Sequence, residues 1–364
     1  MTLIIFVELA VGIVCLVGGA DVLVKGAVKL AARFGIPPLI IGLTVVAFGT
    51  SAPETAVSVN AALSGNGDIA IGNVLGSNIA NILLILGITA LVIPLTVSRQ
   101  VVRLDIPIMI IASIATFILC LDGEISHIDG ILLFSALILY VIFLIYSSRK
   151  QKESIDDELV TTIEIENTKK PFAWITHLSL IIIGLILLII GSHFLIDGAV
   201  SFAQIMGLSK LVTGLTVVAI GTSLPELATS VIAAYKGERD LAVGNIIGSN
   251  LFNLLCVLGL TAIVSPTPIL VADQALHFDF PIAIAVSFMC LPIVLTGFRI
   301  DRWEGLLLLL YYVAYTFYII LIAMHQPLAQ PFFDSMLHYV IPLTLLLLFT
   351  MMIINWKKKQ RQLN

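Results

Sequence analysis

The sequence predicts an all-α membrane protein made of two inverted five-helix repeats and one extra C-terminal transmembrane helix. Its 364 residues are 59% hydrophobic and only 12% charged, with a mean hydropathy of +1.10, a composition typical of membrane proteins. Apolar stretches of about 18 to 25 residues recur along the chain, and each can cross a hydrocarbon layer about 30 Å thick as a helix. Two long motifs also occur twice.

The apolar stretches predict eleven spans, five in each repeat and one beyond the second repeat. Because the stretches are continuous rather than alternating, they exclude a transmembrane β-barrel. The predicted spans are 3–24, 38–62, 70–93, 104–121, 129–147, 174–197, 211–234, 241–264, 278–296, 303–323 and 338–355.

The basic residues predict the orientation of these spans. When the eleven spans alternate across the bilayer, eighteen of the nineteen Lys and Arg residues fall on one side, and only Lys210 falls on the other. Basic residues are retained on the cytoplasmic side. We therefore expect a multi-pass protein of the cell (inner) membrane with its N-terminus outside and its C-terminus in the cytoplasm.

The duplicated motifs define the repeats. The segment AFGTSAPETAVSVNAAL at 47–63 matches AIGTSLPELATSVIAAY at 219–235, an offset of 172 residues. The same offset carries DIAIGNVLGSNIANILLILG at 68–87 onto DLAVGNIIGSNLFNLLCVLG at 240–259. Since each repeat holds an odd number of spans, the two repeats must be inverted relative to each other.

The repeats divide the chain into four parts. A polar segment of 23 residues joins the repeats, and it is too short to form a regulatory domain, so we interpret it as a solvated tether. The predicted parts are the first repeat at 1–147, the cytoplasmic linker at 148–170, the second repeat at 171–325, and the extra helix with a basic cytoplasmic tail at 326–364.

The second span of each repeat contains the motif GTSxPE near its middle. Proline removes an amide donor, and its ring collides with the carbonyl four residues earlier. We therefore expect both helices to break and the carbonyls of Gly49 and Gly221 to lose their helical partners. Within hydrocarbon, a free carbonyl must face protein, water or a bound ion.

Oxygen-bearing side chains surround each predicted break. Thr50 and Glu54 lie four residues apart and share a helix face, as do Ser77 and Asn81 in the next span. Such oxygens suit hard cations such as sodium and calcium, whereas zinc or copper would favour histidine or thiolate. The equivalent residues of the second repeat are Thr222, Glu226, Ser249 and Asn253, and Asn78 and Asn250 lie close to the same faces.

Glu54 and Glu226 are expected to face each other near the bilayer midplane, where two carboxylates would balance one divalent ion. A carboxylate at this depth costs about 2.5 kcal/mol or more, so an unpaired one indicates function. The alternative is a neutral glutamate that is hydrogen-bonded to a neighbour.

Several residues have plainer interpretations. Asp21 and Lys25 can pair at four-residue spacing. The motif glycines can be explained by close helix packing, and four aspartates near helix starts by N-capping. These residues are Gly72, Gly76, Gly244 and Gly248, and Asp68, Asp105, Asp240 and Asp279.

Other chemistries lack their motifs. The sequence contains no HExxH, no Walker A lysine and no nucleophile paired with a base, so neither an enzyme nor direct ATP drive is supported. The four cysteines lie in apolar stretches without CxxC spacing, which argues against disulfides and a zinc site. No cofactor and no nucleic-acid partner are expected.

The segments GTSAPE, GTSLPE, GNVLGSNIAN and GNIIGSNLFN resemble the two alpha-repeats of the calcium/cation antiporter superfamily. Over residues 3–323 the chain is similar to prokaryotic sodium/calcium exchangers with a ten-helix core. The resemblance implies a secondary active antiporter that exchanges sodium for calcium by alternating access, with the first and sixth helices sliding past the remainder. Some relatives carry an aspartate at the position of Asn253.

The resemblance also implies the cation ligands, with Glu54 and Glu226 binding calcium. The transported ions would be calcium and sodium, and a monomer in the lipid bilayer would hold a complete site. The implied ligands are Ala47, Thr50, Ser51, Glu54, Ser77, Asn81, Ala219, Thr222, Ser223, Glu226, Ser249 and Asn253, with Asn78 and Asn250 as possible additions.

Other functions stay open at this point. A calcium (cation)/proton antiporter could use the same glutamates, with protonation replacing sodium binding. A passive cation channel could also use a midplane carboxylate pair, and an intramembrane enzyme is the remote third alternative.

Overall fold

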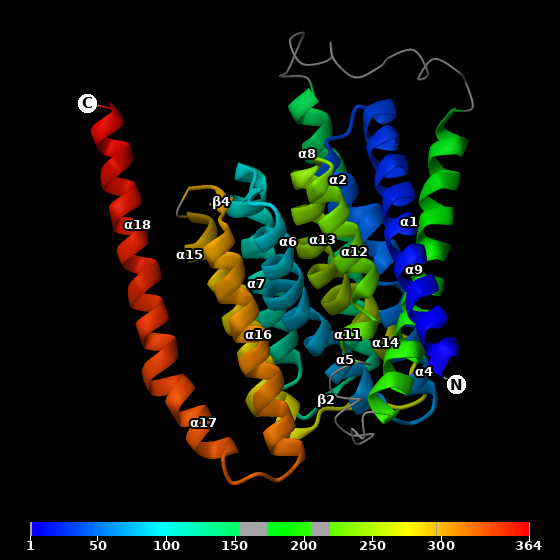
Figure 1. Ribbon diagram of the computed structural model, residues 1–364, viewed down its shortest axis with the longest axis vertical. Helices are drawn as coiled ribbons and strands as arrows, with labels where there is room; N and C mark the ends of the chain where they lie inside the picture. Colours follow the sequence, from blue (N-terminus) through cyan, green and yellow to red (C-terminus); the bar gives the residue numbers. More distant parts are fainter. Residues whose placement is uncertain (1, 153–172, 206–218, 296, 364) are drawn as a thin grey trace.

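The computed structural model describes residues 2–152, 173–205, 219–295 and 297–363, and these residues are almost entirely helical (Figure 1). The label η marks a π-helical segment, in which the turns are wider than in an α-helix. The first repeat contains α1 (Thr2–Phe34), α2 (Pro38–Ile41), η1 (Gly42–Val46), α3 (Ala47–Thr50), α4 (Ala52–Leu63), α5 (Gly67–Ala80), η2 (Asn81–Leu86), α6 (Gly87–Val92), η3 (Val101–Asp105), α7 (Ile106–Leu119) and α8 (His127–Lys152).

The second repeat follows the same order, and the extra helix comes after it. Its elements are α9 (Ala173–Ile205), α11 (Ala219–Gly221), α12 (Leu224–Tyr235), α13 (Arg239–Phe252), η6 (Asn253–Val257), α14 (Leu258–Val264), η7 (Ala275–Asp279), α15 (Phe280–Leu295) and α16 (Arg302–Ala323), followed by α17 (Ala329–Ser335), η8 (Met336–Val340) and α18 (Ile341–Leu363).

The transmembrane helices follow the expected spans. In the described part of the chain, nine helices are long and apolar enough to cross a membrane, and the bent pair Pro38–Thr50 and Ala52–Leu63 makes a tenth. The seventh expected span, 211–234, lies outside the described residues up to 218, and α11 and α12 form its remainder. Helix α8 continues to Lys152, five residues into the predicted linker, and the rest of that linker lies outside the described residues.

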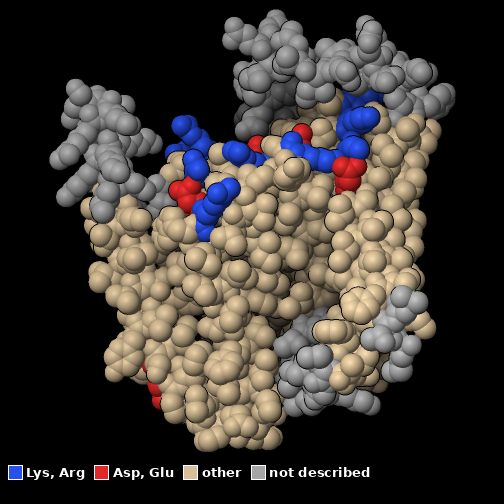
Figure 2. Space-filling view, viewed as in Figure 1, with Lys and Arg blue, Asp and Glu red and all other residues tan. Residues whose placement is uncertain are grey.

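The distribution of charged side chains over the surface is that of a membrane protein. The two ends of the chain lie at opposite ends of the bundle (Figure 1). The Lys and Arg side chains visible in Figure 2 gather along its upper edge, and the broad surface below them is almost free of charge in this view. The upper edge is also where α8 ends and α9 begins (Figure 1).

Helices α1 and α9 pack against each other along rows of glycine. A Cβ added to Gly19 would lie 2.9 Å from the Gly184 carbonyl oxygen, and one added to Gly12 would lie 2.8 Å from the Leu195 nitrogen. Only glycine permits so close an approach of two backbones in a membrane. At these glycines, the backbones of α1 and α9 therefore approach each other directly, without side chains between them.

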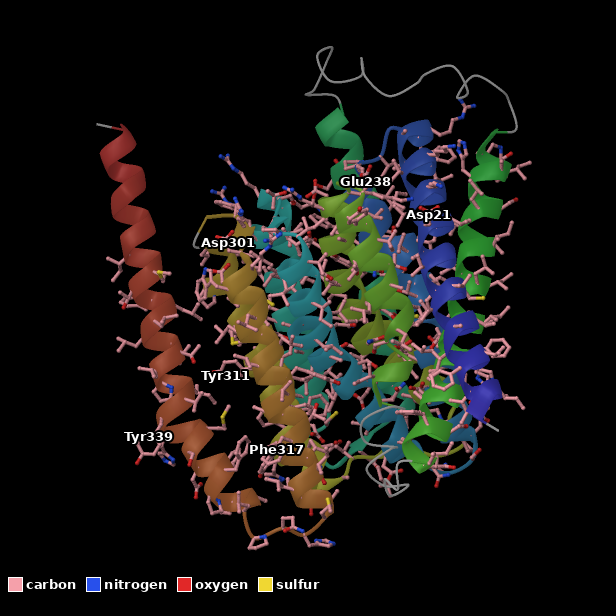
Figure 3. All side chains as sticks on the ribbon, viewed as in Figure 1. Asp21, Glu238, Asp301, Tyr311, Phe317 and Tyr339 are labelled. Carbon is pink, nitrogen blue, oxygen red and sulfur yellow. The ribbon has the colours of Figure 1, made fainter. Side chains whose placement is uncertain are left out.

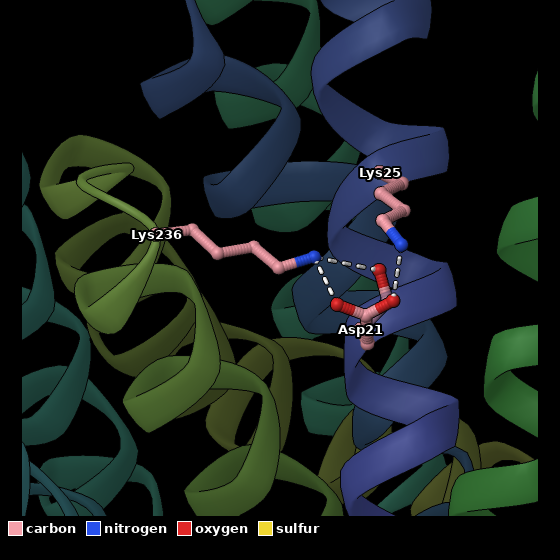
Figure 4. Close-up of polar contacts among 3 residues, drawn as sticks. All are labelled: Asp21, Lys25 and Lys236. Carbon is pink, nitrogen blue, oxygen red and sulfur yellow. Dashed lines mark hydrogen bonds and ion pairs between the residues drawn. The ribbon is translucent and has the colours of Figure 1, made fainter.

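A charged cluster connects α1 to α12 at the basic edge (Figure 4). The carboxylate of Asp21 contacts Lys25 at 2.6 Å, which confirms the pairing expected from the four-residue spacing. It also forms an ion pair with Lys236, which follows α12, and the Lys236 ammonium donates to the Asp21 carbonyl at 3.3 Å. The second ion pair joins the two repeats, and the spacing along one helix could not predict it.

Two short antiparallel strand pairs join the repeats at opposite ends of the bundle. Strand β1 (Leu95–Thr96) pairs with β4 (Arg299–Ile300), and β2 (Glu124–Ile125) pairs with β3 (Ile269–Leu270). The labels β4 and β2 mark the upper and lower ends in Figure 1. Each pair takes one strand from each repeat, so both ends of the bundle are joined by backbone hydrogen bonds.

The core contains the two helices that follow the GTSxPE segments. In α13 every residue from Leu241 to Phe252 is buried, and α5 is buried from Ser77 to Ala80. Gly244 and Gly248 are packing positions, since an added Cβ would lie 2.7 Å from the Leu39 carbonyl and 2.8 Å from Leu43 Cα. At Gly72 and Gly76, no described atom lies within 4 Å of an added Cβ, and the residues equivalent to Leu39 and Leu43, at 211 and 215, lie outside the described residues. Packing at these two glycines therefore stays a prediction.

The four aspartates expected as N-caps do not cap their helices with a side-chain hydrogen bond. Asp68 and Asp240 lie in the first turns of α5 and α13, where a negative charge still favours the helix dipole. Asp105 is fully buried and accepts a hydrogen bond from the Tyr140 hydroxyl at 3.0 Å. Asp105 and Asp279 each end a π-helical segment, η3 and η7, that continues directly into the next helix. The proline two residues later therefore marks no helix start.

The extra helix stands beside the second repeat (Figure 1). Phe332 of α17 packs against Phe317 of α16 with ring centroids 5.2 Å apart. The Tyr311 hydroxyl donates to the Thr344 hydroxyl at 2.8 Å, and Figure 3 shows Tyr311 on α16 on the side of α18. Most of the apolar side chains of α18 remain exposed, as for Leu343 and Leu346, which suits contact with lipid.

Candidate cation site between the two repeats

Both GTSxPE helices break at the serine of the motif. Ser51 has φ −81° and ψ 9°, and Ser223 has φ −89° and ψ 8°, so neither continues the helix. Pro53 and Pro225 then occupy the second position of the new helices α4 and α12, where a missing amide hydrogen costs little. The expected break is confirmed, and the two breaks have the same geometry.

The breaks bring the two glutamates together through crossed hydrogen bonds. The hydroxyl of Ser51 donates to Glu226 Oε1 at 3.3 Å, and the hydroxyl of Ser223 donates to Glu54 Oε1 at 3.4 Å. Both glutamates are 1% exposed. Each carboxyl group therefore lies against the broken helix of the opposite repeat, and the two glutamates are neighbours as expected.

The glycine carbonyls at the two breaks have different hydrogen-bond partners. The carbonyl of Gly49 accepts a backbone N–H at the end of α3. The carbonyl of Gly221 accepts a hydrogen bond from the Ser192 hydroxyl of α9 at 2.6 Å. Both oxygens thus have protein partners, because the chain tightens at the break on one side and α9 supplies a donor on the other. The expected loss of the helical partner is therefore wrong for Gly49, whereas the partner of the Gly221 carbonyl comes from another helix, as the expectation allowed.

Asn73 and Asn245 brace the site from the next helix. The amide nitrogen of Asn73 donates to the Ser58 hydroxyl at 3.0 Å and to the Glu54 carbonyl at 3.3 Å. Asn245 makes the equivalent bonds to Ser230 at 3.0 Å and to the Glu226 carbonyl at 3.4 Å. Our sequence reasoning missed both residues, although the duplicated GN of the motif was a signal for them.

Thr50, Ser77 and Ser249 contribute buried hydroxyl groups to the site. The Thr50 hydroxyl donates to Asn245 Oδ1 at 3.2 Å and lies 3.5 Å from the Ser249 hydroxyl. Ser77 and Ser249 are buried, at 3% and 0% exposed. The structure therefore brings Thr50 of the first repeat against α13 of the second.

Four asparagines form a second crossed arrangement. The nitrogen of Asn81 donates to Asn250 Oδ1, and the nitrogen of Asn253 donates to Asn78 Oδ1, both at 3.1 Å. Asn78 in turn donates to the Asn250 carbonyl at 3.2 Å. Asn81 and Asn253 also begin the π-helical segments η2 and η6, a widening that is frequent at functional sites.

The threonine of the second break, Thr222, differs from its counterpart. It is half-buried, and no hydrogen bond of its side chain is found among the described residues, whereas Thr50 is 1% exposed and bonded. The carbonyl of Ala47 accepts the Ser51 backbone N–H at 3.0 Å, and Ala219 begins α11. The side chain of Ala219 lies outside the described residues.

In the candidate site, four buried oxygens are left without a hydrogen-bond partner among the described residues: Glu54 Oε2, Glu226 Oε2, Asn81 Oδ1 and Asn253 Oδ1. Leaving such atoms unpaired in the interior is costly, and carboxylate and amide oxygens are the ligands that calcium prefers. No cluster of three His, Cys, Asp or Glu side chains occurs in the described ranges. The donor set therefore fits a hard cation.

Comparison with known protein families gives a match over most of the chain. The family model described as sodium/calcium exchanger protein matches residues 4–146 and 176–321, which include both glutamates and all four asparagines. The chain belongs to the sodium/calcium exchanger protein family. The two matched segments correspond to the two repeats that the duplicated motifs define.

Individual members of the family are similar over most of their length. The inner membrane protein YrbG of Escherichia coli is 42% identical over 286 residues, which cover 77% of this chain and 86% of YrbG. The sodium/calcium exchanger MaX1 of Methanosarcina acetivorans is 33% identical over 340 residues, which cover 85% and 97%.

A solved structure of the sodium-calcium exchanger NCX_Mj, soaked with Na+ and Sr2+, superimposes with a TM-score of 0.72 at 31% identity. The match covers 89% of this chain and 99% of that one. It confirms the predicted fold of ten-helix exchangers.

Proposed function

We propose that this protein exchanges sodium for calcium across the membrane, and that Glu54 and Glu226 hold the calcium ion between the two repeats. The crossed serine–glutamate bonds carry the proposal, because they place both carboxyl groups together in the interior. One divalent ion balances two carboxylates, and sodium ions can occupy the same oxygens. The family membership supports the same function.

The remaining ligands are assigned by position. Ser77 and Ser249 lie on the buried helices α5 and α13, and Asn81 and Asn253 begin the π-helical segments that follow them. Among the described residues, an oxygen of each of these two asparagines has no hydrogen-bond partner. Thr50 and Ser51 with Thr222 and Ser223, together with the carbonyls of Ala47 and Ala219, complete the proposed set.

Exchange follows from competition for these oxygens. Two bare carboxylates that lie close together in a medium of low dielectric constant repel each other strongly, so the empty site resists burial. Bound sodium or bound calcium removes the repulsion. The conformational change requires neutralised carboxylates, so it occurs only when sodium or calcium is bound. Exchange by this route needs no covalent chemistry.

We place the protein in the inner membrane as a monomer, with the N-terminus outside and the basic edge in the cytoplasm. The asymmetry of Lys and Arg supports this orientation, and the E. coli relative is an inner membrane protein. A single chain contains both repeats and thus all the proposed ligands.

Reconstituted vesicles test the function. Radiolabelled calcium should accumulate when sodium flows outward, and Glu54→Gln and Glu226→Gln should each reduce uptake to background, because each removes one negative charge from the site. Glu124→Gln, in strand β2, provides a matched control that should transport normally.

The same vesicles separate the alternatives. Sodium-independent uptake driven by a pH gradient would instead indicate proton coupling. Uptake that persists without any counter-ion gradient would indicate a channel. Full gradient-driven transport by both glutamine variants would contradict the proposed site.

A further inference from the structure

The four asparagines Asn78, Asn81, Asn250 and Asn253 do not have equivalent hydrogen-bond partners in the two repeats, and this difference assigns different roles to them. We infer that Asn78 is a positioning residue that fixes the amide of Asn253, so that this site requires a neutral donor at position 253 but accepts a carboxylate at position 81. The inference rests on the proposed function, because it treats Asn81 and Asn253 as cation ligands.

The orientation of Asn78 is determined by a backbone carbonyl. The Asn250 carbonyl lies 3.2 Å from Asn78 Nδ2 and can only accept, so the nitrogen of Asn78 must face it. Asn78 Oδ1 then faces Asn253, which must turn its own nitrogen toward that oxygen at 3.1 Å. Because an amide has its oxygen opposite its nitrogen, Asn253 Oδ1 is left free.

The equivalent hydrogen bonds of Asn81 and Asn250 fix the side-chain amide of Asn250 less firmly. Asn81 donates to Asn250 Oδ1 at 3.1 Å, but the nitrogen of Asn250 faces the Met109 sulfur at 3.4 Å. A thioether is a weak acceptor. The side-chain amide of Asn250 can therefore turn over at small cost and present its nitrogen to residue 81, whereas Asn78 cannot do so without opposing its oxygen to a carbonyl.

This difference determines which charge each ligand position accepts. An ionised aspartate at position 253 has no hydrogen to donate, so its oxygen would face Asn78 Oδ1 across the present 3.1 Å contact. An aspartate at position 81 would instead receive a hydrogen bond from the rotated Asn250. All four asparagines are 5% exposed or less, so water does not relieve the first contact. The oxygen of Asn78 therefore explains why residue 253 is a neutral asparagine.

Two aspartate variants test the inference. Asn81→Asp and Asn253→Asp add the same charge at equivalent positions, so attraction for calcium alone would lower the calcium KM in both. We expect Asn81→Asp to lower the KM or leave it unchanged, and Asn253→Asp to raise it about tenfold while the maximal rate changes less. The measurement is the initial rate of sodium-driven calcium uptake at a series of calcium concentrations.

A second substitution should rescue the first. Asn78→Ala removes the opposing oxygen, so the double variant Asn78→Ala/Asn253→Asp should recover most of the calcium affinity that Asn253→Asp loses. Asn78→Ala alone should raise the KM severalfold, because the Asn253 amide is no longer fixed. A purely structural role for Asn78 predicts that the double variant is worse than either single variant.

The outcomes separate this inference from the proposed function. If both aspartates shift the KM in the same direction, or if Asn78→Ala fails to rescue Asn253→Asp, the inference is wrong while exchange stands. If the unaltered protein shows no sodium-driven uptake, the proposed function fails, and calorimetric titration of the same purified variants with calcium still compares the two aspartates. Should Asn253→Asp not be recovered folded, an unchanged calcium KM in Asn78→Ala overturns the inference.

Discussion

At the scale of single residues, the serines that cross between the repeats are the most direct probe of the site. Ser51→Ala removes a hydrogen bond to the Glu226 carboxylate, and hydrogen bonds to charged groups contribute about 1.5–3 kcal/mol. We expect the KM for calcium to rise at least tenfold, and we expect Ser223→Ala to have a similar effect because its bond to Glu54 is equivalent. Uptake assays at varied calcium concentration measure both effects.

The control for these serines lies on α9. Ser179 is exposed and donates to the carbonyl of Ile175 in its own helix, so Ser179→Ala should leave the KM unchanged. A Ser51→Ala protein with normal calcium affinity would show that the crossed bonds are absent in the working protein.

Residue spacing predicted that Thr50 and Glu54 share a helix face, as do Ser77 and Asn81. The break at Ser51 separates Thr50 in α3 from Glu54 in α4, and the role of these residues as cation ligands stays a prediction. Residue spacing acts within one helix. It could not predict partners on other helices. Ser192 binds the Gly221 carbonyl from α9, and Asn245 braces Glu226 from α13. Such contacts depend on how helices cross, and only the three-dimensional arrangement reveals that crossing.

At the scale of elements, the proline of each motif predicted the helix break, because its missing amide hydrogen and its ring act on the adjacent turn. The π-helical segments η2 and η6 were not predicted, because nothing in residues 81–86 or 253–257 opposes an ordinary α-helix. The close packing of α1 on α9 likewise depends on glycines in both helices meeting each other. Their role becomes visible only when both helices are present.

The ion pair between α1 and α12 predicts a change in exchange rate. Lys236→Met removes the Lys236–Asp21 bond and leaves Asp21 paired with Lys25 (Figure 4). The two side chains are 26% and 35% exposed, so the bond contributes at most about 1 kcal/mol. If α1 moves against α12 during exchange, the maximal rate should rise up to about fivefold, with the calcium KM unchanged.

Lys25→Met is the matched control, because Lys25 and Asp21 lie on the same helix and their bond does not cross between the repeats. Saturating calcium and a fixed sodium gradient isolate the maximal rate in both variants. An equal change in both variants would show that local charge, rather than the connection to α12, sets the rate.

At the scale of the whole molecule, the repeats are held together by contacts that the linker does not supply. The strand pairs β1–β4 and β2–β3, the packing of α1 on α9 and the crossed bonds of the site all join one repeat to the other. Residues 1–152 and 173–364, expressed together as separate chains, should therefore copurify from detergent and retain calcium transport. Affinity purification through a tag on one chain measures this.

The control for this prediction is to express the two chains in separate cells and mix them after extraction. Recovery only after coexpression shows assembly within the membrane. Failure to copurify after coexpression would show that the linker, and not the set of contacts between the repeats, determines the association.

The inverted arrangement itself was predictable, because an odd number of spans in a duplicated unit permits no other orientation. The strand pairs were not predictable, since two residues form too short a pattern. The place of α18 beside the second repeat was likewise not in the sequence, because its apolar side chains carry no periodic signal for a particular neighbour.

The crossed serine–glutamate bonds also bear on ancestry. Two copies of one short polypeptide, inserted in opposite directions, could form both bonds at once. A dimer of identical single-repeat chains could therefore have transported ions before the gene was duplicated and fused. In such a homodimer every substitution occurs twice. After fusion the two copies could change independently, and the different hydrogen-bond partners of Asn78 and Asn250 are an example of such a change.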